Sequence, residues 1–332
     1  MIRMSCPSWG PSADFSISKE GGIKTKIRIG TRGSALALTQ STWVADSIRG
    51  RHPDCEVELI TIKTKGDIMQ DVSLVQIGGK GLFIKEIEEA LLRGDVDVAV
   101  HSMKDVPAEL PDGLEIAVTP LREDPRDVLV SSGNRKLEEM PRGARIGTCS
   151  LRRGCQLRNR MPDLEIVTLR GNLDTRIRKV ETEGLDGVIV AAAGIRRMGW
   201  VAKVSQFIPV ELMLPAVGQG VLGIETRKDD ARVRGAIDFL NDPVTGCEVG
   251  AERSFLKRLE GGCQLPIAAL AKKTGESITL EGLVGSEDGR VMIRDAVKGA
   301  ADAYEAVGRE LAEKILARGG RAILDEVYRE KG

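Results

Sequence analysis

The tetrapeptide RIGT occurs at residues 28–31 and again at 145–148, and each copy begins the same predicted order of elements. A helical segment follows, then an extended run (VELITIKT, LEIVTLR), then a second helix and a last buried run (VDVAVHS, GVIVAAAG). Four matching residues alone can arise by chance, but the shared order favours a duplicated α/β lobe. Strands that alternate with helices predict parallel sheets with helices on both faces, and two such lobes would form a cleft between them.

The rest of the chain adds a crossing strand and a third unit. The segment LPAVGQGVLGIE (214–225) contains a strand after the second lobe, and we expect it to return to the first lobe. From about residue 241 the pattern becomes α+β, with helices in CEVGAERSFLKRLEGG and AYEAVGRELAEKILARGG and strands in SITLEGLVG and VMIRDAV. The predicted parts are a disordered extension (1–22), domain 1 (23–121 and 216–240), domain 2 (122–215) and domain 3 (241–332).

The composition argues against several classes of function. The 332 residues include 49 basic and 49 acidic side chains, so no net charge attracts nucleic acid or a membrane. Aromatic residues make up 3%, too few for a base-stacking surface. No apolar run approaches the roughly 20 residues that span a bilayer, and the first 22 residues lack the apolar core of a secretory signal. Six cysteines without a C-x-x-C pair and only two histidines predict no metal site and a cytoplasmic location.

Basic side chains cluster where the predicted strands end. In an open α/β sheet, ligands bind in the crevice outside these ends, where helix N-termini add free N–H groups. Residues 145–197 alone hold eleven Lys and Arg against six Asp and Glu. The pattern predicts a large ligand with several negative charges. The basic residues at strand ends are Arg32, Lys104, Arg152, Arg153, Arg170, Arg196 and Arg197.

Two of these strand ends allow a functional and a structural interpretation. Asp105 directly follows a buried strand, so its carboxylate can stabilise a developing cation or move a proton, or it can simply cap a turn. Arg152 and Arg153 come just after Ser150, a good helix cap. The two guanidinium groups can bind a carboxylate with paired hydrogen bonds, or they can form ordinary surface ion pairs.

Two glycine-rich segments are similarly open to interpretation. GGKGLF (78–83) lacks the spacing of a phosphate-binding loop, so it is either a mobile lid that brings Lys80 and Phe83 over the cleft or a plain loop. Cys263 in EGGCQLP has glycines beside it that leave its thiol uncrowded. It is an attachment site, a nucleophile or a small loop cysteine.

Taken together, the motifs resemble one known family. They occur in fixed order over residues 27–266, as IRIGTRGSALALTQ, GGKGLF, HSMKDVP, REDPRD, GTCSLRR, LRGNLDTR, AAAGIRRMG, LPAVGQG and LEGGCQLP. These motifs are long and specific, and on them the chain is identified as similar to the porphobilinogen deaminase (hydroxymethylbilane synthase) family. The resemblance implies an α/β fold with two lobes like type II periplasmic binding proteins and a smaller C-terminal α+β domain.

The resemblance also implies a reaction. Family members are transferases of haem and other tetrapyrrole (porphyrin) biosynthesis that join four porphobilinogen molecules head to tail. Each molecule loses ammonia, and water then releases the linear hydroxymethylbilane. The growing chain is attached to a dipyrromethane cofactor held by a thioether, here at Cys263. A monomer that acts on porphobilinogen and the polypyrrole chain, and on neither nucleic acid nor membrane, is the expectation.

Site residues follow from the same motifs. Asp105 matches the catalytic aspartate, which stabilises the methylene-pyrrolenine cation formed as ammonia leaves. Each porphobilinogen carries an acetate and a propionate, so a cleft filled by the growing chain needs many cations. Gln76 stands where some members have a lysine, and Cys149 where others have a serine. The positions that match contacts to cofactor or substrate carboxylates are Arg32, Ser34, Lys104, Arg122, Ser150, Arg152, Arg153, Arg170, Arg176 and Arg197.

Two other functions compete with this interpretation. A non-catalytic two-lobed protein that binds polycarboxylates would explain the lobes and the arginines, but it gives Asp105 and Cys263 no role. A nucleic-acid binder that uses the arginine-rich middle of the chain agrees poorly with zero net charge and scarce aromatic residues.

Overall fold

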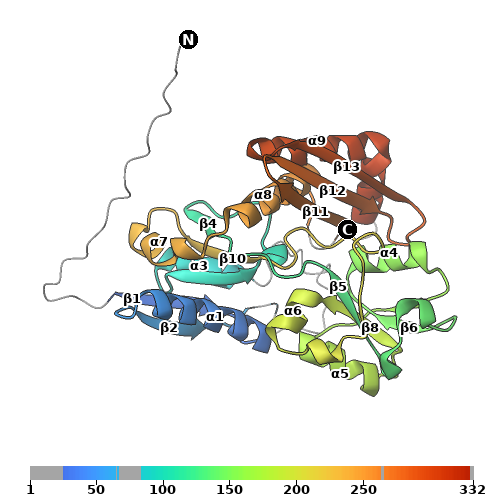
Figure 1. The fold of residues 1–332 in the computed structure, drawn as a ribbon, viewed down its shortest axis with the longest axis horizontal. Helices are drawn as coiled ribbons and strands as arrows, with labels where there is room; N and C mark the ends of the chain where they lie inside the picture. Colours follow the sequence, from blue (N-terminus) through green and yellow to red (C-terminus); the bar gives the residue numbers. More distant parts are fainter. Residues whose placement is uncertain (1–24, 65, 67–83, 263–264, 330–332) are drawn as a thin grey trace, which may run out of the picture.

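The computed structural model describes residues 25–64, 66, 84–262 and 265–329, which form three sheets with their helices (Figure 1). The first sheet has five strands in the order β2-β1-β3-β10-β4. Its strands are β1 (Lys26–Thr31), β2 (Glu56–Thr61), β3 (Val98–Ser102), β4 (Leu114–Val118) and β10 (Leu222–Arg227), and its helices are α1 (Ala35–Arg51), α3 (Lys85–Arg93) and α7 (Ala231–Ile237).

The second sheet repeats this arrangement with the order β7-β6-β8-β5-β9. In each sheet the strand that contains RIGT, β1 or β6, lies between two parallel neighbours. The duplication predicted from the two RIGT copies is therefore confirmed. The elements are β5 (Asp127–Ser131), β6 (Arg145–Gly147), β7 (Glu165–Val167), β8 (Gly187–Ala191), β9 (Gln206–Phe207), α4 (Leu151–Arg160), α5 (Leu173–Thr182) and α6 (Ala192–Arg197).

The sheets are mixed, which corrects the expectation of parallel sheets. β10 pairs antiparallel with β3 and β4, and β5 pairs antiparallel with β8 and β9. The reason is the route of the chain, because each reversed strand is the first that follows a crossing between lobes. The reversed strand therefore begins at the edge of the sheet where the neighbouring strands end. Asp127 at the start of β5 pairs with Ala191 at the end of β8, and Leu222 at the start of β10 pairs with Ser102 at the end of β3.

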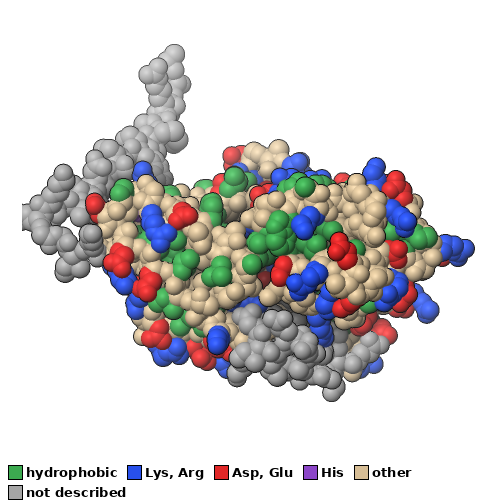
Figure 2. Space-filling view, turned by 90° about the horizontal axis from the view of Figure 1, so that it is seen from below, with side chains coloured by type: hydrophobic (Ala, Val, Ile, Leu, Met, Phe, Trp, Pro, Cys, Tyr) green, Lys and Arg blue, Asp and Glu red, His purple; other side chains and the backbone are tan. Residues whose placement is uncertain are grey.

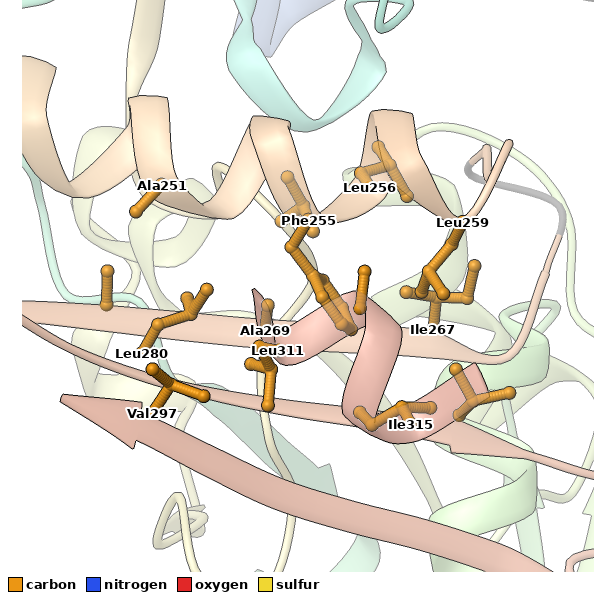
Figure 3. Packing of buried hydrophobic residues seen from close by; sticks show 14 of the residues in the cluster. Ala251, Phe255, Leu256, Leu259, Ile267, Ala269, Leu280, Val297, Leu311 and Ile315 are labelled. Atoms are coloured by element: carbon orange, nitrogen blue, oxygen red, sulfur yellow. The ribbon is translucent and has the colours of Figure 1, made fainter. Parts of the chain in front are cut away.

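The third unit is a three-stranded antiparallel sheet covered by helices. Phe255 of α8 and Leu311 of α9 meet over this sheet and are fully buried (Figure 3). A side chain at Gly282 would lie 2.8 Å from the ring of Phe255, so this position requires glycine. The elements are β11 (Ile267–Thr274), β12 (Ser277–Gly285), β13 (Met292–Ala300), α8 (Pro243–Arg258), α9 (Tyr304–Ile315) and α10 (Arg321–Arg329).

The C-terminal helix differs from its prediction in one respect. The single helix expected over residues 303–320 ends at Ile315 and passes through a wide turn (Leu316–Gly320) into α10. Gly319 has a φ of 101°, a backbone conformation that interrupts a helix and favours glycine.

The architecture is thus two α/β lobes with a smaller C-terminal α+β unit, as expected. Among the described residues, no helix is both long and apolar enough to cross a membrane. Basic and acidic side chains are interspersed on the face shown in Figure 2.

Candidate active site

A cavity of about 610 Å³ lies where the three units meet. Its size is typical of a site for a small organic ligand. Lobe residues from both sheets line it, together with residues 216–221 from the connection to β10 and, from the third unit, Leu256, Gly262, Leu265 and Ile267. The predicted cleft between the lobes is therefore present, and the third unit contributes to its wall.

The N-terminal turns of three helices face this cavity. Ser34 caps α1, its hydroxyl accepting from the amide of Ala37, and Ser150 caps α4, accepting from the amide of Arg153. Asn172 precedes α5 and also lines the cavity. Because a helix N-terminus carries partial positive charge, these three turns favour bound anions.

The structure brings seven of the predicted basic side chains together. Each of the seven follows a parallel strand of one lobe or lies in the helix after it, and all reach the same cavity. Arg196, also predicted at a strand end, does not line the cavity and instead pairs with Asp124 (3.4 Å) and Glu123 (3.6 Å). Arg176 donates from Nε to the carbonyl of Gly171 (2.7 Å), and Arg197 donates from Nη2 to that of Gly220 (2.7 Å). The lining cations are Arg32, Lys104, Arg152, Arg153, Arg170, Arg176 and Arg197.

Burial makes these cations receptive to anions. It lowers the pKa of Lys104, although the negative charge of Asp105 acts in the opposite direction. It likewise lowers the pKa of Arg197, which Glu123 partly offsets. A cation that has lost hydration without a full counter-charge gains stability when a carboxylate binds beside it.

Asp105 is the acidic residue predicted to carry the chemistry. It ends the short 3-10 turn Met103–Asp105, directly after β3, and it is half-buried in the cavity wall. Its negative charge acts on the neighbouring Lys104, which lines the same cavity.

Arg152 and Arg153 are more deeply buried than their prediction implied. Both side chains are 5% exposed, and both bind the fully buried carboxylate of Asp127 at 2.7 Å. Gln219 donates to the same carboxylate from Nε2 (3.0 Å). Asp127 and Gln219 were not predicted, although they lie in the REDPRD and LPAVGQG motifs.

Arg122 is the one predicted contact that the structure places outside the cavity lining. Its guanidinium forms an ion pair with Glu252 of α8 (2.5 Å), and its Nε donates to the carbonyl of Gln219 (3.0 Å). The arrangement joins the connection between the two lobes to the third unit.

Three predicted site residues, Lys80, Phe83 and Cys263, lie outside the described residues, as does the extension 1–22. Gly262 and Leu265, the described residues nearest to Cys263 in the sequence, both line the cavity.

Comparison with known proteins decides the family. The chain matches the family model "Porphobilinogen deaminase, dipyromethane cofactor binding domain" over residues 27–235 and "Porphobilinogen deaminase, C-terminal domain" over 247–317. The chain belongs to the porphobilinogen deaminase family. It is 60% identical over 301 residues to the porphobilinogen deaminase of Syntrophus aciditrophicus (91% of this chain, 98% of the relative). It is 53% identical over 306 residues to that of Geotalea daltonii (92% and 96%).

Solved structures add a distant likeness. The substrate-binding domain of a putative molybdenum ABC transporter from Clostridium difficile is 10% identical, with a TM-score of 0.41 over 66% of this chain and 93% of that one. A similarity this low says nothing about what the chain binds.

Membership of the porphobilinogen deaminase family makes this chain an enzyme of tetrapyrrole synthesis and does not favour a non-catalytic binding protein. The cavity suits the cofactor named in the family model. Seven cationic side chains match a ligand rich in carboxylates, and apolar residues such as Val217 and Leu265 offer surfaces for pyrrole rings.

Proposed function

We propose that this member of the porphobilinogen deaminase family is a transferase that joins four porphobilinogen molecules head to tail and releases linear hydroxymethylbilane by hydrolysis. The observation that carries the proposal is the cavity itself. It combines the half-buried carboxylate of Asp105 with seven cationic side chains, and it includes Gly262 and Leu265, the described residues nearest to Cys263 in the sequence.

Cys263 is the proposed attachment point. A thioether there would hold a dipyrromethane, which when bound supplies a covalent anchor and a free pyrrole α-carbon for the first substrate. The position of Gly262 and Leu265 in the cavity wall supports this assignment. So does the cationic lining, since the carboxylates of both cofactor and substrate require counter-charges.

Asp105 is the proposed catalytic residue. In each addition the bond from the aminomethyl carbon to nitrogen breaks and ammonia leaves. A carbon–carbon bond then forms to the free α-carbon of the terminal ring, which loses its proton. The carboxylate of Asp105 stabilises the positive charge that develops on the substrate ring and can accept the proton.

The remaining lining residues bind carboxylates. Charge-assisted hydrogen bonds contribute about 1.5–3 kcal/mol each, so several of them can hold and register a growing chain. Arg122 has a different task in this proposal, because its guanidinium is occupied by Glu252. The carboxylate-binding set is therefore Arg32, Ser34, Lys104, Ser150, Arg152, Arg153, Arg170, Arg176 and Arg197.

We also propose a monomeric cytoplasmic enzyme that uses no nucleic acid or membrane, as the family resemblance implies. Zero net charge supports the last point, because it gives the protein no global attraction to nucleic acid or to a charged membrane. The sheets agree with domain 1 at 23–121 and 216–240, domain 2 at 122–215 and domain 3 at 241–332.

The test combines intact-mass spectrometry with an Asp105→Asn variant. The purified wild-type protein should carry one dipyrrole on Cys263, and Asp105→Asn should keep it while turnover falls about 100-fold or more. Asp112→Asn is the matched control, since Asp112 is exposed and does not line the cavity. An unmodified but active wild-type chain would disprove the attachment of a dipyrrole to Cys263. Near-normal turnover in Asp105→Asn would show that Asp105 only caps a turn.

A further inference from the structure

Asp127 receives four hydrogen bonds from side chains, although it contributes to none of the predicted strand-end contacts. Its Oδ1 accepts from Arg153 Nε (3.0 Å) and Nη2 (2.7 Å) and from Gln219 Nε2 (3.0 Å). Its Oδ2 accepts from Arg152 Nη1 (2.7 Å). The carboxylate is fully buried, and all three donor residues line the cavity. Asp127 thus does not line the cavity itself but binds three side chains that do.

These bonds fix the orientation of both guanidinium groups. Arg152 also donates to the carbonyl of Leu214 (2.8 Å) and to Gln219 Oε1 (3.5 Å), and Arg153 donates to the carbonyl of Ile189 (3.0 Å). Each guanidinium has five N–H groups, and bonds to protein among the described residues engage three of them. The other two on each group are left for a ligand at the cavity.

The charges do not cancel. Two guanidinium groups face one carboxylate. Their positive charges and hydrogen bonds outweigh the opposing effect of burial and hold the pKa of Asp127 well below its usual range, so the carboxylate stays ionised. The buried trio therefore has one surplus positive charge, which favours a ligand carboxylate beside it.

We infer that Asp127 is a positioning residue for Arg152 and Arg153, which it orients toward a carboxylate of the pyrrole chain. The inference rests on the proposed function. It assigns a task to the first residue of a reversed strand, which holds two of the proposed substrate-binding arginines.

The test is Asp127→Asn, which keeps the shape of the side chain and removes its charge. Asp124→Asn is the matched control: Asp124 lies three residues earlier, binds Arg126 (2.7 Å) and Arg196 (3.4 Å), is 10% exposed and does not line the cavity. Dipyrrole content by intact mass, kcat and KM for porphobilinogen, and the melting temperature are measured for both, with kinetics recorded well below the lower melting temperature.

The expected result is a folded Asp127→Asn protein that either lacks the dipyrrole or shows kcat/KM lowered about tenfold to hundredfold, mainly through KM. Asp124→Asn should stay loaded and within threefold of wild type. If Asp127→Asn does not fold, Asp127→Glu keeps the charge but displaces it, and it should raise KM more than it lowers kcat.

Two outcomes would overturn the inference: Asp127→Asn within threefold of the control in kcat/KM, or, if only Asp127→Glu folds, wild-type KM in that variant. A wild-type protein that neither carries a dipyrrole nor consumes porphobilinogen would instead refute the proposed function, so the two failures are distinguishable.

Discussion

The carboxylate of Glu252 joins three parts of the chain, and we predict that Glu252→Gln destabilises the protein by about 3–5 kcal/mol. The side chain is fully buried. It accepts from Nη1 and Nη2 of Arg122 (2.5 and 3.3 Å) and from the amides of Gly218 (2.7 Å) and Ala271 (2.9 Å). Glutamine preserves the shape, but Arg122 loses its counter-charge and one donor must face the new NH₂ group.

Thermal melting followed by circular dichroism measures the effect. With about 2–4 °C per kcal/mol for domains of this size, the melting temperature should fall by roughly 6–20 °C. Glu313→Gln is the control, because Glu313 pairs with Arg258 at 2.6 Å but is 57% exposed. An exposed pair contributes about 0–1 kcal/mol, so this variant should barely shift.

The two ion pairs have nearly the same length, so a difference between the two variants reports the effect of burial and not of the distance between the charges. Equal shifts in the two variants, or a fall of less than about 3 °C in Glu252→Gln, would show that the buried pair contributes no more than a surface pair.

Two further predictions concern buried titratable groups. Burial and the negative charge of Glu225 raise the pKa of Glu88 to about 7, so its contribution to stability is fully present below about pH 4.5 and lost as pH rises through 7. Glu88→Gln should therefore raise the melting temperature at pH 8 and change it little at pH 5; equal shifts at both pH values would contradict this. Burial also raises the pKa of Cys155 to about 12, whereas Cys149 is exposed. Peptide mass spectrometry after brief iodoacetamide treatment at pH 8 should find Cys149 labelled and Cys155 unlabelled, and similar labelling of both would refute the assignment.

The sequence predicted those parts of the site that follow parallel strands. Arg32, Lys104 and Asp105 come after strands of the first lobe, and Arg170 and Arg197 after strands of the second, so one rule about strand ends located them all. The family resemblance added Arg176, Ser34 and Ser150, and the cavity contains these as well.

The same rule could not find residues at the start of a strand or before it. Asp127 begins β5 and Gln219 lies before β10, and these strands run against their neighbours because the chain has just crossed between lobes. Strand direction depends on that crossing and is not visible in local periodicity. The pairing of Arg122 with Glu252 was equally out of reach, since 130 residues separate them and only the packing of α8 brings them together.

The position of β10 between β3 and β4 also bears on how the protein is made. The second sheet is continuous in the sequence, from β5 to β9, so all its strands have been synthesised once residue 207 is added. In the first sheet, β4 pairs only with β10 among the described strands, and β10 ends at Arg227. The lobe that is synthesised first is therefore the later of the two to complete its sheet, and β4 awaits its partner while the whole second lobe emerges.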